Sequence, residues 1–320
     1  MDKKRSLLLL VVFVSALLSV ALPMRTAHAA ASGPRVECWV SILPQAYLVK
    51  SVGGDRVGVR VMVGPGQVPH TYEPTARQLS ELSSARLFFS VGVAFEDALL
   101  PRIERNFRTV KIVDMTSGVK RRLASEDEFH GSDQKDAAQR PPEKDAPADS
   151  HGHGGFDPHV WLSPRIAAVM ARNTRDALVA VDPEGADAYR SNCHALEAEL
   201  DSVDAELAER LRPYRGREIF VFHPAYGYFT DAYGLAQTAI EENGAAPGPR
   251  HLAEVIDRAR EQGTKTVYIQ PQGSASYAET GAKAIGAKLV TLDPLAEDYI
   301  KNLNSMARAI VAAFDEPGTR

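Results

Sequence analysis

Three histidines and one aspartate stand out as residues that could bind a metal ion. His70, His159, His223 and Asp293 lie in the local sequences VPHTYEPT, FDPHVWLSP, FVFHPAYG and LVTLDPLAED. Three imidazoles and one carboxylate complete the tetrahedral shell that zinc prefers. Neutral imidazoles also suit copper, nickel and iron, whereas carboxylate-rich sites suit manganese. The residue types therefore indicate a metal site and favour zinc over manganese.

Most of the candidate ligands share a position relative to the predicted strands. His70, His223 and Asp293 each follow a run that is typical of a β-strand, and His159 precedes a predicted helix. Ligands of open α/β sheets bind outside the carboxyl ends of the strands. A proline adjoins each of the four residues and restricts the backbone there, although prolines also commonly mark strand ends. One such histidine alone would more often be structural or solvent-facing, but four comparable settings favour a shared site.

The elements that must position these residues alternate between strand and helix patterns. Short β-branched and aromatic runs occur at residues 35–42, 57–63, 87–92 and 110–115, and again at 218–222, 236–241, 265–270 and 287–292. Helical patterns separate them. Such alternation predicts parallel sheets covered by helices. We therefore expect the α/β class, with two lobes that each contain a mainly parallel four-stranded sheet.

A long helical stretch lies between the two blocks. Apolar residues recur at helical spacing over residues 164–181 and again from Pro183 to about Leu211, where Asp182-Pro183 is a helix-start signal. The second helix would span roughly 40 Å and could join two lobes, although it could also pack along a single domain. The expected division is an N-terminal lobe at 30–182, a linking helix at 183–212 and a C-terminal lobe at 213–320.

The first residues predict export. MDKKR is a positive n-region, LLLLVVFVSALLSVAL is an apolar h-region, and Ala27-His28-Ala29 is a small-x-small cleavage site. We expect residues 1–29 to be a cleaved signal peptide, with an uncleaved N-terminal anchor as the alternative. No cysteine directly follows the predicted cut, so we expect a periplasmic protein without a lipid anchor.

Residues 117–156 have a different composition. They contain few large apolar residues and many Pro, Gly, Asp, Glu and Lys, which predicts a mobile loop. Its histidines, His130, His151 and His153, could collect metal weakly or could be incidental to a solvated linker. The two cysteines, Cys38 and Cys193, lie in a predicted strand and a predicted helix, and we favour two buried free thiols over a disulfide.

Composition excludes one class of partner. The chain carries a formal charge of −4, with 44% hydrophobic and 24% charged residues, which is ordinary for a globular protein. Nucleic-acid binding needs a clustered basic face, which this balance does not indicate. We therefore expect no nucleic-acid partner.

Several ordered segments resemble a known family, the ABC-transporter solute-binding proteins that deliver zinc or manganese. The segments are PHTYEPT, DPHVWLSP, FHPAYGYFTDAYGL, ENGAAPGPRHLAEV and LDPLAEDYIKNL, and the resemblance covers nearly the whole mature chain. It implies two α/β lobes bridged by a long helix, with the metal in the cleft between them. His70 and His159 would come from the first lobe, and His223 and Asp293 from the second.

The resemblance also bears on the choice of metal. Zinc-type members tend to carry a charged, histidine-bearing loop before the second ligand, and here that loop is short. Manganese-type members usually have a carboxylate where this chain has His223. In one departure, Gln270 lies where many relatives have a glutamate, so a second-lobe carboxylate near the site is missing there.

Together these features predict a monomeric periplasmic protein that binds Zn²⁺ as cargo and delivers it to a membrane ABC permease. A manganese or iron carrier of the same family is one alternative. A zinc-dependent hydrolase is another, because three histidines without Asp293 would resemble a catalytic site with an open position. Neither HExxH nor a nucleophile-elbow motif occurs, so we expect no enzyme and no catalytic residue. A surface adhesin with structural zinc is disfavoured by the missing lipid-anchor cysteine.

Overall fold

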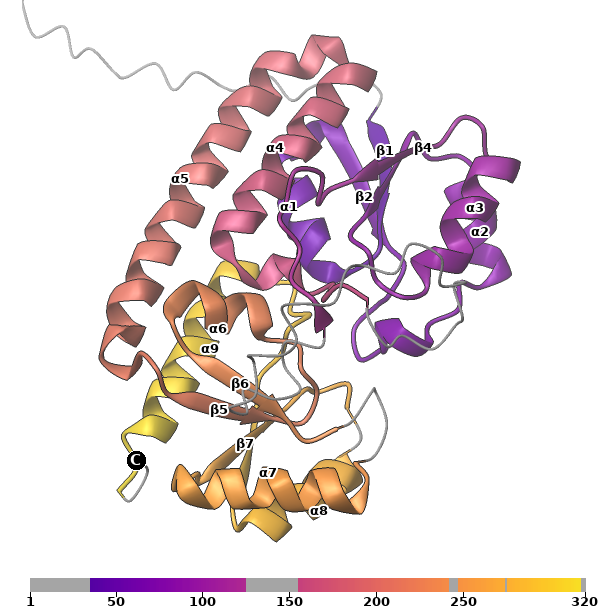
Figure 1. Ribbon diagram of the computed structural model, residues 1–320. Helices are drawn as coiled ribbons and strands as arrows, with labels where there is room; N and C mark the ends of the chain where they lie inside the picture. The colour runs from indigo at the N-terminus through magenta and orange to yellow at the C-terminus, as the bar shows by residue number, and fades with distance from the viewer. Residues whose placement is uncertain (1–34, 125–154, 242–246, 274, 318–320) are drawn as a thin grey trace, which may run out of the picture. The chain divides into compact units, whose positions relative to one another are not determined.

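The computed structural model describes residues 35–124, 155–241, 247–273 and 275–317 (Figure 1). All of the described residues belong to one compact unit of the chain. The predicted signal peptide at 1–29 and most of the predicted mobile loop, including its three histidines, lie outside the described residues.

The first sheet contains four parallel strands. These are β1 (Val36–Val40), β2 (Val57–Val61), β3 (Leu87–Ser90) and β4 (Lys111–Asp114), in the order β2-β1-β3-β4. All four residues of β3 are buried, as expected for a continuous apolar run inside a parallel sheet. The carboxyl ends of β1 and β2 are neighbours, since Val40 pairs with Val61. This edge leads directly into the segment that carries His70.

Three helices connect these strands. They are α1 (Leu43–Gly53), α2 (Ala76–Leu82) and α3 (Glu96–Asn106). The buried Gln45 caps the start of α1, because its side-chain oxygen accepts hydrogen bonds from the backbone N–H groups of Ser41 and Ile42. Gly54 follows the end of α1 with a φ of 54°, a left-handed value that glycine adopts without strain. Helix α1 therefore ends where glycine lets the backbone change direction.

The second sheet repeats the arrangement of the first. Its parallel strands are β5 (Glu218–Val221), β6 (Ala236–Ala239), β7 (Thr266–Ile269) and β8 (Lys288–Thr291), in the order β6-β5-β7-β8. The helices of this half are α6 (Gly227–Tyr233), α7 (Pro249–Glu261), α8 (Ala275–Ile285) and α9 (Tyr299–Phe314). The predicted α/β class with two four-stranded parallel sheets is confirmed.

Two helices lie between the sheets in sequence. Helix α4 spans Pro164–Val181, and α5 spans Ala186–Leu211 after the short 3-10 turn Pro183–Gly185. Helix α5 contacts α1 and α4 of the first half and α9 of the second (Figure 1). The predicted long helix is therefore present, and it packs against both halves.

One hydrophobic core includes parts of both halves. It contains Val40 of β1, Leu200 of α5 and Ile310 of α9, each with at most 1% of its surface exposed. Cys38 and Cys193 are buried in the same core as free thiols, which confirms that expectation. Among the described helices, none has the length and apolar character needed to cross a membrane.

Candidate metal site

The segment after β2 positions His70. This residue lies in the short 3-10 turn Pro69–Thr71, and the turn is closed by the hydrogen bond from the Tyr72 N–H to the Pro69 carbonyl. Pro69 is buried and fixes its own φ, while the His70 side chain reaches outward from the turn. His70 therefore lies beyond the carboxyl end of β2, as predicted, and its role as a ligand stays a prediction.

His159 is held by Asp157, two residues earlier in the chain. The buried Asp157 accepts two hydrogen bonds at Oδ1, from the His159 backbone N–H and from its Nδ1, each at 2.8 Å. A neutral imidazole that carries its proton on Nδ1 has a free lone pair on Nε2, and this lone pair can bind a metal ion. Burial alone would raise the pKa of Asp157, but hydrogen bonds from His159 and the charge of Arg122 lower that pKa below its ordinary value.

His223 is held in the same way by a different carboxylate. It follows the carboxyl end of β5, and its Nδ1 lies 2.5 Å from Oε1 of Glu241. Glu241 follows the neighbouring strand β6, so the two side chains leave the same edge of the sheet. Glu241 and Asp157 are not among the site residues predicted from the sequence. The available signals were the position of Glu241 at a strand end and the Asp-Pro-His spacing before His159.

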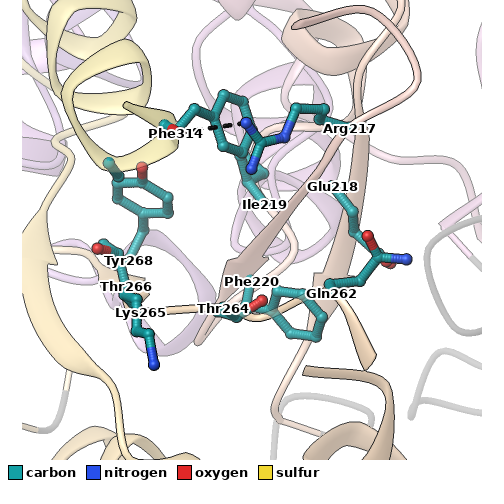
Figure 2. A pocket seen from close by; sticks show the side chains of 11 residues that line it. Arg217, Glu218, Ile219, Phe220, Gln262, Thr264, Lys265, Thr266, Tyr268 and Phe314 are labelled. Atoms are coloured by element: carbon teal, nitrogen blue, oxygen red, sulfur yellow. Dashed lines mark hydrogen bonds between the residues drawn. The ribbon is translucent and has the colours of Figure 1, made fainter. Parts of the chain in front are cut away.

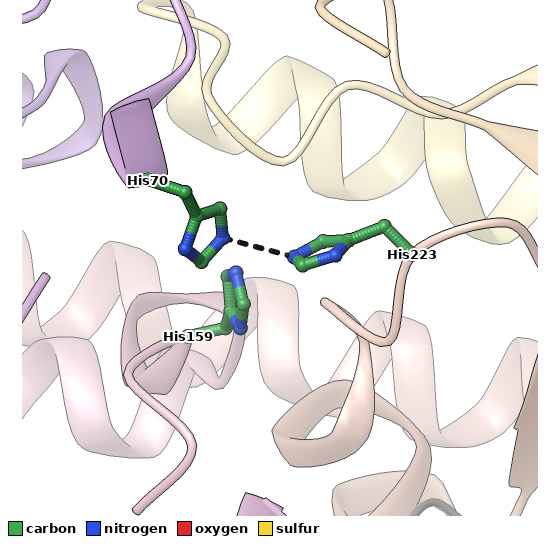
Figure 3. A group of neighbouring side chains, drawn as sticks. All are labelled: His70, His159 and His223. Atoms are coloured by element: carbon green, nitrogen blue, oxygen red, sulfur yellow. Dashed lines mark hydrogen bonds between the residues drawn. The ribbon is translucent and has the colours of Figure 1, made fainter. Parts of the chain in front are cut away.

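The three imidazoles converge (Figure 3). One ligand nitrogen from each of His70, His159 and His223 lies within 4.8 Å of the others, and Nε2 of His70 is 3.2 Å from Nε2 of His223. Zinc bound tetrahedrally at about 2.05 Å would place its nitrogen ligands about 3.3 Å apart. The pair formed by His70 and His223 already has this spacing. Small movements of His159 would complete three corners of a tetrahedron.

The electrostatics of the group keep one imidazole neutral. Part of the His70 side chain is open to solvent, but its ring faces the other two imidazoles (Figure 3). Loss of water around the ring, followed by repulsion from His223 and His159, lowers the pKa of His70 from 6.5 to about 3. At neutral pH this side chain is therefore an uncharged donor, which is the form that binds metal.

Asp293 is not brought into this group. Its Oδ1 accepts hydrogen bonds from Gln272 Nε2 at 3.0 Å and from the Leu295 N–H at 2.9 Å. It lines a cavity of about 320 Å³ together with Gln272 and Glu297. Among the described residues, the metal-competent group contains the three histidines without Asp293. Its role as a fourth ligand stays a prediction.

Trp161 joins the segments that carry His159 and Asp293. Its ring lies 5.3 Å from the His159 ring, and its Nε1 donates to the Pro294 carbonyl at 2.7 Å. The Tyr299 hydroxyl in turn donates to the Trp161 carbonyl. Trp161 and Tyr299 are fully buried and His159 is also buried, so this candidate ligand lies in tightly packed surroundings.

Two parallel α/β halves with one shared core, and imidazoles contributed by both, define a two-lobed solute-binding protein with a candidate metal site. The chain belongs to the family described as "Zinc-uptake complex component A periplasmic" (ZnuA), which it matches over residues 39–313. The predicted family resemblance is confirmed.

Relatives and solved structures agree with this membership. The chain is 27% identical over 272 residues to the high-affinity zinc uptake system protein ZnuA of Yersinia pestis, covering 83% of this chain and 85% of that protein. A crystal structure of ZnuA aligns with a TM-score of 0.76 at 33% identity, covering 87% of this chain and 99% of the other. A zinc-bound ZnuA deletion mutant aligns with a TM-score of 0.74, also at 33% identity, covering 87% and 98%.

Proposed function

We propose that this protein captures Zn²⁺ in the periplasm and delivers it to an ABC permease in the cytoplasmic membrane. The observation that carries the proposal is the convergence of His70, His159 and His223, whose ligand nitrogens lie within 4.8 Å of one another. The names of the relatives support the cargo, since they describe zinc uptake and a zinc-bound structure. In this function Zn²⁺ is the transported ligand and the protein needs no other cofactor.

The work of the site is ligand exchange. Zinc sheds water and binds neutral imidazoles. Asp157 orients the His159 ring through its Nδ1, and Glu241 orients the His223 ring in the same way. Three borderline nitrogen donors favour zinc over manganese, and Asp293 or water supplies the fourth position. His70 and His159 belong to the first half and His223 to the second, so separating the halves would remove ligands and release the ion.

The family description and the leader sequence support a proposed location. We propose that residues 1–29 are cleaved on export and that the mature chain carries no lipid anchor, since no cysteine directly follows the predicted cut. We further propose that the mature protein works as a monomer, because one chain contributes all three imidazoles.

A zinc-dependent hydrolase is the second candidate, because Asp293 lies outside the imidazole group and three histidines with an open position are typical of catalytic zinc. Such an enzyme also needs a general base. Asp157 and Glu241 are each hydrogen-bonded to an imidazole, which makes them orienting groups rather than bases. This difference favours the carrier.

One experiment separates these functions. The purified protein is analysed for metal, stripped with a chelator, and titrated with Zn²⁺ by calorimetry beside a variant in which all three histidines are alanine. A carrier gives one tight, reversible site in the parent and none in the variant. Turnover of ester or peptide substrates by the zinc-loaded parent would contradict the carrier function.

A further inference from the structure

Arg122 contacts the carboxylate that orients His159. Its Nη1 donates to Oδ2 of Asp157 at 3.4 Å, while Oδ1 of the same carboxylate holds the His159 ring. The side chain of Arg122 is 9% exposed and that of Asp157 is 2% exposed. A buried carboxylate is costly without a compensating charge, and Arg122 supplies that charge. The two oxygens of Asp157 therefore link a candidate zinc ligand to an arginine.

The same arginine reaches the second half of the protein. Its Nε lies 3.1 Å from Oδ2 of Asp231 on α6, which forms an ion pair. Its backbone N–H donates to the hydroxyl of Tyr228, also on α6, at 3.0 Å. The Tyr228 hydroxyl donates to the Asp157 carbonyl at 3.2 Å, and the Asp157 N–H donates to the Arg122 carbonyl at 3.0 Å. Arg122 and Asp157 are thus fixed to each other and to α6.

The sequence leaves space for the guanidinium. Helix α6 begins at the buried Gly227, and a Cβ atom there would lie 1.8 Å from Nη1 of Arg122 and 2.9 Å from Oδ2 of Asp157. Any side chain at this position would displace the guanidinium or the carboxylate. Glycine at this position leaves room for the guanidinium of Arg122, and this observation is independent of the ion pairs.

We infer that Arg122 is a positioning residue of the zinc site, which holds Asp157 so that His159 presents Nε2 to the ion. The inference rests on the proposed function. Removal of Arg122 leaves Asp157 buried without its counter-charge, so the carboxylate turns toward other donors and the His159 ring loses its fixed orientation. Through Asp231 and Tyr228, the same arginine ties this orientation to α6 of the half that carries His223.

The test is zinc titration of full-length variants. Groups that orient a metal-bound histidine typically contribute about 10–100-fold to metal affinity, and we expect a loss of this size in Arg122→Gln. Arg122→Lys keeps the positive charge but lacks the planar guanidinium, so its zinc affinity should lie between those of Arg122→Gln and the parent. Gly227→Ala should reproduce the loss, since its methyl group occupies the position of the guanidinium.

A double-mutant cycle separates positioning from folding. If Arg122 acts through Asp157, Arg122→Gln should lower zinc affinity much less in an Asp157→Asn background than in the parent. Thermal unfolding of each metal-free variant measures its stability separately. A role confined to folding would lower the melting temperature while the folded protein kept the parental zinc affinity, and that result would overturn the inference.

Arg258→Gln is the matched control. Arg258 Nε lies 2.8 Å from Oε1 of Glu218, whose side chain is 5% exposed, so this pair also neutralises a buried carboxylate. Glu218 lines a small pocket at the amino end of β5 (Figure 2). His223 follows the opposite end of that strand. The control should lose stability and keep its zinc affinity.

The possible failures are distinguishable. If the parent binds no zinc, the proposed function is wrong and the inference falls with it. If the parent binds zinc and folded Arg122→Gln binds it equally well, only the inference is wrong. An equal loss of zinc affinity in Arg258→Gln would also overturn it, because the effect would then come from general destabilisation.

Discussion

Nε2 of His70 lies 3.2 Å from Nε2 of His223, although 153 positions separate the two residues. The contact joins the loop after β2 in the first sheet to the loop after β5 in the second. Two imidazole nitrogens at this distance either share a proton or bind a common ion. The 3.2 Å spacing is that of two nitrogen ligands on one tetrahedral zinc ion, so we propose a shared metal ion at this contact.

Alanine at any one of the three histidines should reduce zinc affinity by more than the roughly 10–100-fold expected for orienting residues. Each variant removes one coordinate bond and leaves the strands intact, so circular dichroism should match the parent. Calorimetric titration measures the affinity, and Trp161 fluorescence gives a second readout, since this ring lies 5.3 Å from the His159 ring. A variant with parental affinity would show that its histidine is not a ligand.

Asp293→Ala should weaken zinc binding if the carboxylate joins the imidazoles when the ion is present. Gln272→Ala is the matched variant, because it removes a hydrogen bond that holds the Asp293 carboxylate outside the group and leaves the charge in place. We expect Gln272→Ala to bind zinc at least as tightly as the parent. Parental affinity in Asp293→Ala would assign the fourth position to water.

Zinc should bind more tightly than manganese, as expected for three imidazole donors and from the Irving–Williams order. His223→Glu should narrow the difference between the two metals, since a carboxylate suits manganese better than an imidazole does. Competition titration of parent and variant with both ions measures the difference. Copper binding alone decides nothing, because copper is favoured over zinc at most such sites. A parent that prefers manganese would refute the zinc assignment and leave the carrier class standing.

Deletion of residues 126–153 should leave one tight zinc site and remove only weaker additional binding. The two ends are already adjacent, since Ala124 N–H donates to the Gly155 carbonyl at 2.9 Å and Leu123 pairs with Phe156 in an antiparallel bridge. After the deletion, Ser125 and Gly154 are the two residues left between Ala124 and Gly155, which is the length of a two-residue hairpin turn. Stoichiometry from calorimetry provides the check. Loss of the tight site on deletion would mean that a ligand has been misplaced.

The metal-free protein should lose stability as the pH falls from about 6.5 toward 3. His70 has a pKa lowered from 6.5 to about 3 in the folded state, so within this window the unfolded chain binds the extra proton. Protonation then favours unfolding, and the unfolding free energy decreases with decreasing pH. The His70→Gln variant should show a shallower decrease in urea titrations. Equal slopes for the two proteins would contradict the lowered pKa.

Much of the fold could be predicted because local patterns determine it. The β-branched runs became the eight strands, and the helix predicted at residues 164–181 has those bounds in the structure. The long helix begins three residues later than predicted, at Ala186, because Pro183 opens a separate 3-10 turn. The predicted run at 236–241 ends as a strand at Ala239, which leaves Glu241 in the loop that faces His223.

The site was only partly predictable. His70 and His223 follow from the rule that ligands lie beyond the carboxyl ends of parallel strands. Glu241 obeys the same rule, but pairing it with His223 requires knowing that β6 lies beside β5, and strand order cannot be derived from local pattern. Arg122 and Asp157 meet through tertiary hydrogen bonds that leave no periodic signal in the sequence. The carboxylate of Asp293 is held by Gln272, a contact that also depends on tertiary packing.

The matching strand orders, β2-β1-β3-β4 and β6-β5-β7-β8, give the chain the form of a duplicated unit. By that correspondence β5 is the counterpart of β1 and β6 of β2, so His223 and His70 follow strands that are not counterparts. Glu241, an orienting carboxylate, occupies the place after β6 that His70 occupies after β2. Two identical copies of either half could not provide both His70 after one second strand and Glu241 after the other. The candidate metal site therefore depends on two halves that match in topology and differ in the side chains they present.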